Sequence, residues 1–218
     1  LLRARSQRPA GYLITECLPT TLLEWVNQSK ALEVHVAHAL CEQIADGLVY
    51  LHSQGIAHQQ LRPSNVLLDL QVKAQVPLAK LTGFGLLPLL RAQSWWDPMF
   101  SPQLRYSSPE WLDTMSSQYE TPSSDVYALG LVWAFMLTGE EPFAGLDSLG
   151  ALRKAHANRR MEPVVPPERA SELLDKCRAH DAHDRPSSLQ VLLELRLPTV
   201  DAPSGSLTGL PESVGQAS

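Results

Sequence analysis

The sequence has 218 residues, a formal net charge of −5 and 19% charged residues. This length can bury one sizeable core, and 44% hydrophobic residues is ordinary for a globular domain. Because no long run of Lys and Arg occurs, we expect no nucleic acid or anionic membrane surface as a partner. No apolar run is long enough to span a bilayer, so a membrane span is also not expected.

The three cysteines lie far apart, at Cys17, Cys41 and Cys177, without the spacing of a metal site. An odd count argues against a complete framework of disulfides. We therefore expect reduced cysteines in the core of a cytoplasmic protein.

The first half of the chain alternates short elements with one long helix. Residues 12–16 have the alternating character of a short strand, and residues 17–19 break it. Thr21 is a suitable N-cap for a short helix over residues 22–26. Apolar residues then recur at helical spacing through residues 31–52, which predicts a long amphipathic helix with one buried face.

The second half begins with two hydrophobic pieces, residues 65–68 and 79–81, that predict a small hairpin. Residues 83–110 contain four prolines and are expected to be irregular. Residues 125–138 are apolar nearly all round, which predicts a helix buried inside the domain. Three shorter helices are expected over residues 149–159, 170–180 and 187–196. Residues 197–218 are rich in Pro, Ser and Gly and predict a flexible tail after a single domain over residues 1–196.

Five segments resemble motifs of the eukaryotic protein kinases, in the order and spacing of that family. They are the catalytic loop (His58-Gln59-Gln60-Leu61-Arg62-Pro63-Ser64-Asn65), the magnesium motif (Thr82-Gly83-Phe84-Gly85), the end of the activation segment (Ser108-Pro109-Glu110), the start of the central helix (Ser124-Asp125-Val126-Tyr127-Ala128-Leu129-Gly130) and the late Arg-Pro element (Asp184-Arg185-Pro186-Ser187). The resemblance covers about residues 12–196 and is closest to the tyrosine-kinase-like group.

The resemblance implies a mainly α fold with a few short strands, namely the large C-terminal lobe of a kinase. No Gly-rich phosphate loop precedes residue 12, and only eleven residues are available there. We therefore expect most of the smaller N-terminal lobe to be absent from this sequence. Residues 12–16 would be its last strand and residues 17–19 the hinge.

By the same resemblance, the positions that carry phosphoryl transfer are altered. Gln60 stands where the family has its catalytic Asp, and an amide has no usable basicity near neutral pH. Gln59 replaces an Arg that contacts phosphorylated activation loops, and Gly83 replaces the Asp that holds magnesium. Asn65 and Arg62 keep vestigial roles in binding metal and phosphate, or merely hold the loop.

The architectural positions of the family are intact. The resemblance implies an ion pair between Glu110 and Arg185, and a carboxylate at Asp125 that receives backbone N–H groups of the catalytic loop. It places His58 beneath that loop. A protein that functions by binding would keep its structural residues and lose its catalytic ones, which is the pattern here. The alternative is a decaying chain without a role.

One stretch between the magnesium motif and Glu110 is rich in large apolar residues: Trp95, Trp96, Met99 and Phe100. Such residues dominate interface hot spots, so we expect a surface for a protein partner. The alternative is that they fold back onto the lobe itself.

These observations predict a pseudokinase, a protein-binding or scaffold module in signal transduction, whose partner is a protein such as an active kinase or a signalling complex. No bound metal or cofactor is expected. Two alternatives stay open, and both would involve ATP and Mg²⁺. One is an unconventional serine/threonine kinase that is active in a full-length form, and the other is a switch that senses ATP without catalysis.

Overall fold

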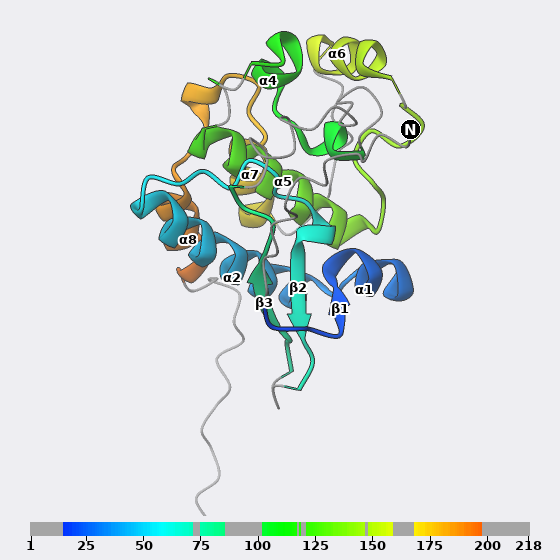
Figure 1. Cartoon of the computed structure of the whole chain (residues 1–218), viewed down its shortest axis with the longest axis vertical. Coiled ribbons are helices and arrows are strands. Elements are labelled where there is room, and N and C mark those ends of the chain that lie inside the picture. The colour runs from blue at the N-terminus through cyan, green and yellow to red at the C-terminus, as the bar shows by residue number, and fades with distance from the viewer. Residues whose placement is uncertain are drawn as a thin grey trace, which may run out of the picture.

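A computed structural model of the chain describes residues 15–71, 75–85, 102–116, 118, 121–146, 148–158 and 168–197. Helices dominate, as the sequence predicts, and a small sheet lies at one end of the molecule (Figure 1). Helix α5 runs through the middle, between the sheet with its neighbours α1 and α2 and the opposite end with α4 and α6 (Figure 1). The helices are α1 (Leu22–Ser29), α2 (Val34–Ser53), α4 (Pro109–Thr114), α5 (Pro122–Thr138), α6 (Leu149–Ala157), α7 (Glu168–Cys177) and α8 (Ser188–Arg196).

The sheet has three antiparallel strands in the order β1 (Thr20–Thr21), β2 (Val66–Asp69) and β3 (Leu78–Leu81). Strands β2 and β3 form the predicted hairpin, in which Val66 pairs with Leu81. The sequence did not indicate β1, which pairs with β2 through only two residues. Such a short strand has no hydrophobic pattern of its own and depends on a neighbour that already exists.

The strand predicted over residues 12–16 is not found in its described part. Residues 12–14 lie outside the described residues, and Thr15 and Glu16 are not in a strand. The side chain of Glu16 pairs with Lys80 on β3 instead, with a 2.8 Å contact. An alternating pattern indicates which residues share a face, but it does not supply the neighbouring strand that a sheet requires.

Helix boundaries follow the caps. Thr21 caps α1 as predicted, because its hydroxyl accepts the Glu24 amide at 3.2 Å and the Glu24 carboxylate accepts the Thr21 amide at 2.9 Å. Helix α2 begins at Val34 rather than residue 31, because the amide of Leu32 donates to the carbonyl of Met136 at the end of α5. The region predicted to be irregular contains helix α4, which Pro109 starts from its first turn.

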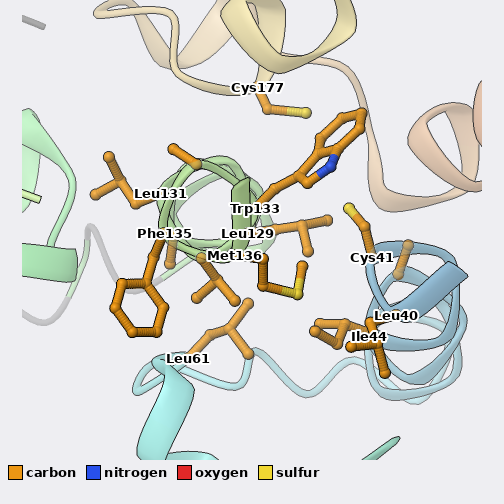
Figure 2. Packing of buried hydrophobic residues seen from close by; sticks show 14 of the residues in the cluster. Leu40, Cys41, Ile44, Leu61, Leu129, Leu131, Trp133, Phe135, Met136 and Cys177 are labelled. Carbon is orange, nitrogen blue, oxygen red and sulfur yellow. The ribbon is translucent and has the colours of Figure 1, made fainter. Parts of the chain in front are cut away.

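The core surrounds α5 on every side, as its all-round apolar pattern predicts. In Figure 2, Trp133 points from α5 toward Cys177 of α7 and Cys41 of α2, whereas Leu131 and Phe135 leave the helix on its other side. Helix α5 ends at Gly139, whose φ of 71° suits glycine. A Cβ there would lie 1.3 Å from the carbonyl oxygen of Lys30, so no other residue fits this close approach.

Two of the three cysteines, Cys41 and Cys177, are buried in this core, as expected, whereas Cys17 is exposed and the expectation was wrong for it. No helix of the described part is long and apolar enough to cross a membrane. Apart from Leu197, the predicted tail lies outside the described residues.

Candidate functional site

The loop that resembles the kinase catalytic loop lies between α2 and β2 and is held by the first turn of α5. The buried carboxylate of Asp125 accepts the backbone amides of His58 at 2.7 Å and Gln59 at 2.8 Å. It also lies 2.9 Å from the Nε2 atom of His52 in α2. Gln59 has a φ of 68°, a left-handed conformation that non-glycine residues adopt at a cost, and Asp125 stabilises it by accepting its N–H.

His58 is fully buried beneath this loop. Its ring meets Phe84 edge to face, with centroids 6.1 Å apart, so it joins the catalytic loop to the segment that resembles the magnesium motif. Burial lowers the pKa of His58, although the nearby charge of Asp125 opposes the shift. The imidazole also accepts the backbone amide of Gln60 at Nδ1, at 3.3 Å, so it supports the loop by a hydrogen bond as well as by packing.

Gln60 and Gly83 occupy the two positions where the family has carboxylates. Gln60 is 8% exposed, and its Nε2 atom is buried without a hydrogen-bond partner among the described residues. Asn65 donates through Nδ2 to the backbone carbonyl of Gln60 at 2.7 Å. Gly83 has a φ of 78°, and a Cβ there would lie 3.2 Å from Asn65 Nδ2. These three positions offer two carboxamides and no carboxylate.

Arg62 is half-buried close to Tyr106 and Glu141. Burial lowers the pKa of Arg62, and these two neighbours oppose the shift. The hydroxyl of Tyr106 donates to the Glu141 carboxylate at 2.8 Å, and burial raises the pKa of Tyr106, so this phenol stays protonated. The Nε atom of Arg62 is buried and has no partner in the described part of the chain.

The ion pair expected between Glu110 and Arg185 is present in the structure. The guanidinium donates to both carboxylate oxygens of Glu110 at 2.8 Å, and it also donates to the carbonyls of Ala179, His180 and Ser123. The side chain of Arg185 is 0% exposed and that of Glu110 is 19% exposed. Burial raises the pKa of Glu110, but the hydrogen bonds and charge of Arg185 outweigh it, so the net pKa is lowered.

This ion pair continues into a chain of ring contacts that crosses to α6. The Arg185 guanidinium lies 4.8 Å from the centre of the Tyr127 ring. The hydroxyl of Tyr127 lies 3.1 Å from Nδ1 of His156, whose ring packs at a tilt against that of Phe143, with the ring centroids 4.5 Å apart. Burial lowers the pKa of His156 to about 4, helped by the nearby His180. The ion pair thus links α4 and α5 to the α7–α8 loop, and the ring contacts extend to α6.

The structure brings the predicted residues of the catalytic loop, the magnesium-like motif and the start of α5 together around Asp125. Glu110 and Arg185 form a second cluster, which is joined to the start of α5 through the Ser123 carbonyl and the Ser124 hydroxyl. The residues predicted to contact a partner, Trp95, Trp96, Met99 and Phe100, lie outside the described residues.

Three participants were missed by sequence reasoning: His52, Tyr106 and His156. His52 joins Asp125 to Ser188 of α8, with 2.8 Å between its Nδ1 atom and the Ser188 hydroxyl. Each of the three lies in a segment without a recognised motif. In such segments the sequence shows only that a polar residue falls on a buried helix face. This suggests that the residue is hydrogen-bonded, but it does not reveal to which partner.

Comparison with known proteins decides the family. Residues 1–195 match the sequence profile of the protein kinase domain. This chain belongs to the protein kinase family. The kinase-like fold expected from the motifs is therefore confirmed.

Individual relatives agree with this assignment. A probable serine/threonine-protein kinase of Dictyostelium discoideum is 27% identical over 197 residues, which cover 88% of this chain and 11% of the relative. Sperm motility kinase 3A of Mus musculus is 28% identical over 194 residues, 88% of this chain and 37% of its own. Kinase suppressor of Ras A of Caenorhabditis elegans is 30% identical over 194 residues, 80% of this chain and 24% of its own. The chain thus spans much less than half the length of these relatives.

Among solved structures, the crystal structure of Rad53 residues 1–466 in complex with AMP-PNP superposes with a TM-score of 0.63 at 24% identity. The match covers 79% of this kinase-family chain and 42% of the Rad53 chain, and it shows a shared fold.

Proposed function

We propose that this chain is a pseudokinase module in intracellular signalling that works by binding a protein partner and does not transfer phosphate. The observation that carries the proposal is the composition of the catalytic loop and the magnesium-like motif. Gln60 and Gly83 leave no carboxylate where the family holds its base and its metal, whereas Asp125, Glu110 and Arg185 keep a fully bonded scaffold.

A general base must accept a proton, and the amide of Gln60 has no basicity near neutral pH. Phosphoryl transfer otherwise depends on positioning and charge stabilisation. Neither of the two loops supplies the anionic oxygen that would orient an attacking hydroxyl. The two loops can therefore keep their conformation, but neither contains a residue that could activate the substrate hydroxyl.

The same residues do not fit a magnesium ion. Mg²⁺ is bound through oxygen ligands in near-octahedral geometry, with carboxylates as the usual protein ligands. Asn65 donates through Nδ2 to the carbonyl of Gln60, which leaves its Oδ1 atom as one neutral oxygen ligand, and Gly83 has no side-chain oxygen. No set of three side chains suited to hold a metal occurs in the part of the chain that the structure describes.

The first test is phosphate incorporation from labelled ATP with Mg²⁺ or Mn²⁺, using excess protein over a long incubation. We expect no transfer above a heat-killed control. A Gln60→Asp/Gly83→Asp double variant should also remain inactive, because the Gly-rich loop, the strand Lys and its Glu partner that hold the γ-phosphate in the family are not among these residues. Transfer by the parent chain would overturn the proposal. ATP-dependent thermal stabilisation without transfer would favour an ATP-sensing switch instead.

The second test concerns the partner. Affinity capture from cells with the parent chain is compared with capture by a Trp95→Ala/Trp96→Ala variant. We expect lost capture at an unchanged melting temperature, because tryptophans are enriched in binding hot spots. Unchanged capture would remove these residues from the proposed surface, and a collapse in melting temperature would assign them to the lobe's own packing.

A further inference from the structure

A chain of buried polar side chains connects the first turn of α8 to the catalytic loop. Ser188 is the first residue of α8 and is 4% exposed, and its hydroxyl lies 2.8 Å from Nδ1 of His52 in the last turn of α2. The Nε2 atom of His52 lies 2.9 Å from the carboxylate of Asp125 at the start of α5. Helix α8 packs beside α2 (Figure 1), so residues that are 136 positions apart in the sequence meet in this chain of contacts.

The donors and acceptors of these contacts follow one direction. Asp125 accepts the amides of His58 and Gln59 on different oxygens, and an ionised carboxylate has no hydrogen to donate. The Nε2 atom of His52 must therefore carry the proton that it shares with Asp125. The other nitrogen of a neutral imidazole is an acceptor, so the hydroxyl of Ser188 donates to Nδ1 of His52. Each hydrogen bond thus orients the next side chain toward the loop.

The far end of these contacts is a strained residue. Gln59 has a φ of 68°, a conformation that is unfavourable for a residue with a side chain. Its amide donates to Asp125 at 2.8 Å, whereas its buried Oε1 atom has no hydrogen-bond partner in the part of the chain that the structure describes. The left-handed conformation of Gln59 therefore depends on where the carboxylate of Asp125 is held, and His52 bonds to that carboxylate.

We propose that Ser188 is a positioning residue that couples α8 to the catalytic loop. Its hydroxyl fixes the ring of His52 in the orientation that directs Nε2–H at Asp125, and Asp125 then holds Gln59 in its left-handed conformation. A displacement of the first turn of α8 breaks the bond between Ser188 and His52 and allows Gln59 to relax. The loop is thereby sensitive to events at α8, and this coupling does not depend on whether the chain transfers phosphate.

The test compares two neighbouring serines at the start of α8. Ser188→Ala removes the hydroxyl that reaches His52, whereas Ser187→Ala removes the N-cap hydroxyl, which accepts the amide of Gln190 at 3.2 Å. We expect hydrogen exchange of the Gln59 amide to be about fivefold faster in Ser188→Ala, which corresponds to the loss of one ordinary hydrogen bond. Ser187→Ala should lower the melting temperature through the lost cap and leave Gln59 exchange unchanged. Ser188→Thr keeps the hydroxyl and should restore slow exchange.

Nuclear magnetic resonance of the ¹⁵N-labelled His52 ring gives a readout that weaker packing alone would not move. In the parent chain we expect a proton on Nε2 and none on Nδ1 at neutral pH, and a changed Nδ1 resonance in Ser188→Ala but not in Ser187→Ala. A proton on Nδ1 in the parent chain would overturn the proposed direction. An unchanged Nδ1 resonance in Ser188→Ala, or equal Gln59 exchange in both alanine variants, would overturn the coupling.

A double-mutant cycle tests whether the effect passes through His52. In a His52→Phe background the hydroxyl of Ser188 has no acceptor at this position, so Ser188→Ala should cause no further acceleration of Gln59 exchange. This non-additivity supports the coupling, because two independent effects would multiply. A full additional acceleration in the double variant would show that Ser188 acts on the loop by another route, which contradicts the proposal.

Discussion

The catalytic loop differs from the two side chains that anchor it and the late helices, Asp125 and Arg185, in how far buried polar atoms find hydrogen-bond partners. In the loop, Gln59, Gln60 and Arg62 each bury a polar side-chain atom that has no hydrogen-bond partner among the described residues. In the scaffold, Asp125 accepts three donors, and all three nitrogens of the Arg185 guanidinium donate.

This difference indicates which buried polar groups stabilise the fold and which ones lower its stability. A buried polar group without a partner costs about 1–3 kcal/mol, whereas breaking a satisfied buried ion pair costs about 3–5 kcal/mol. Substitutions in the two regions should therefore change the free energy of unfolding in opposite directions, provided that they remove the polar atom cleanly.

The largest effect is expected from Arg185→Ala. It leaves Glu110 with 19% exposure and no counter-charge, which should lower the free energy of unfolding by about 3–5 kcal/mol. Chemical denaturation of the purified variant measures this loss. Arg196→Ala is the matched control, because Arg196 is an exposed arginine that also pairs with two carboxylates, Glu42 and Asp46, yet should contribute less than about 1 kcal/mol. Equal losses for the two variants would contradict the comparison.

Asp125→Ala is expected to come next, with a loss of about 3 kcal/mol. It leaves the amides of His58 and Gln59 without an acceptor, and hydrogen bonds to charged groups are worth about 1.5–3 kcal/mol. Hydrogen exchange adds a local measurement, in which the His58 and Gln59 amides should lose protection before the rest of the core. Asp46→Ala, at an exposed position on α2, should leave both amides unchanged. Retained protection in Asp125→Ala would show that this carboxylate does not hold the loop.

An intermediate effect is expected from pH, through His156. Its folded pKa of about 4 lies below the ordinary value of 6.5, so the unfolded chain binds more protons between these values. The stability that His156 contributes is fully present above pH 6.5 and is lost as pH falls toward 4, with a slope of at most about 1.4 kcal/mol per pH unit. Denaturation at several pH values in this window measures the slope.

The control for this prediction removes the titrating group. His156→Phe should flatten the part of the slope between pH 6.5 and 4 that His156 supplies, whereas a variant of the exposed His35, His35→Gln, should leave it. An unchanged slope in His156→Phe would assign the acid sensitivity to other groups.

The smallest effect should have the opposite sign. Gln60→Met removes the unpaired Nε2 atom and keeps a side chain of similar size, so the free energy of unfolding should rise by about 1 kcal/mol. Gln54→Met, at an exposed position, should change it by less than half of that. A destabilised Gln60→Met variant would mean that the Gln60 amide makes a stabilising polar interaction, which would contradict the expected sign.

Particular elements show how far sequence reasoning reached. The capped start of α1, the buried α5 and the hairpin of β2 and β3 follow from local patterns and were predicted. Strand β1 and helix α4 were not, because a two-residue strand and a proline-started turn of helix depend on neighbours. The Glu110–Arg185 pair came from motif resemblance, since 75 residues separate the two in the chain.

The sequence by itself determined the family and the loss of carboxylates at positions 60 and 83, because motif order and residue identity are properties of the chain alone. Only the tertiary structure decided that His52 joins α2 and α8 to Asp125, that Gln60 is buried without a partner, and that the Arg185 pair extends through Tyr127 to His156. The physical reason is that hydrogen bonding and burial depend on which segments meet in space, and this information is distributed over the whole fold.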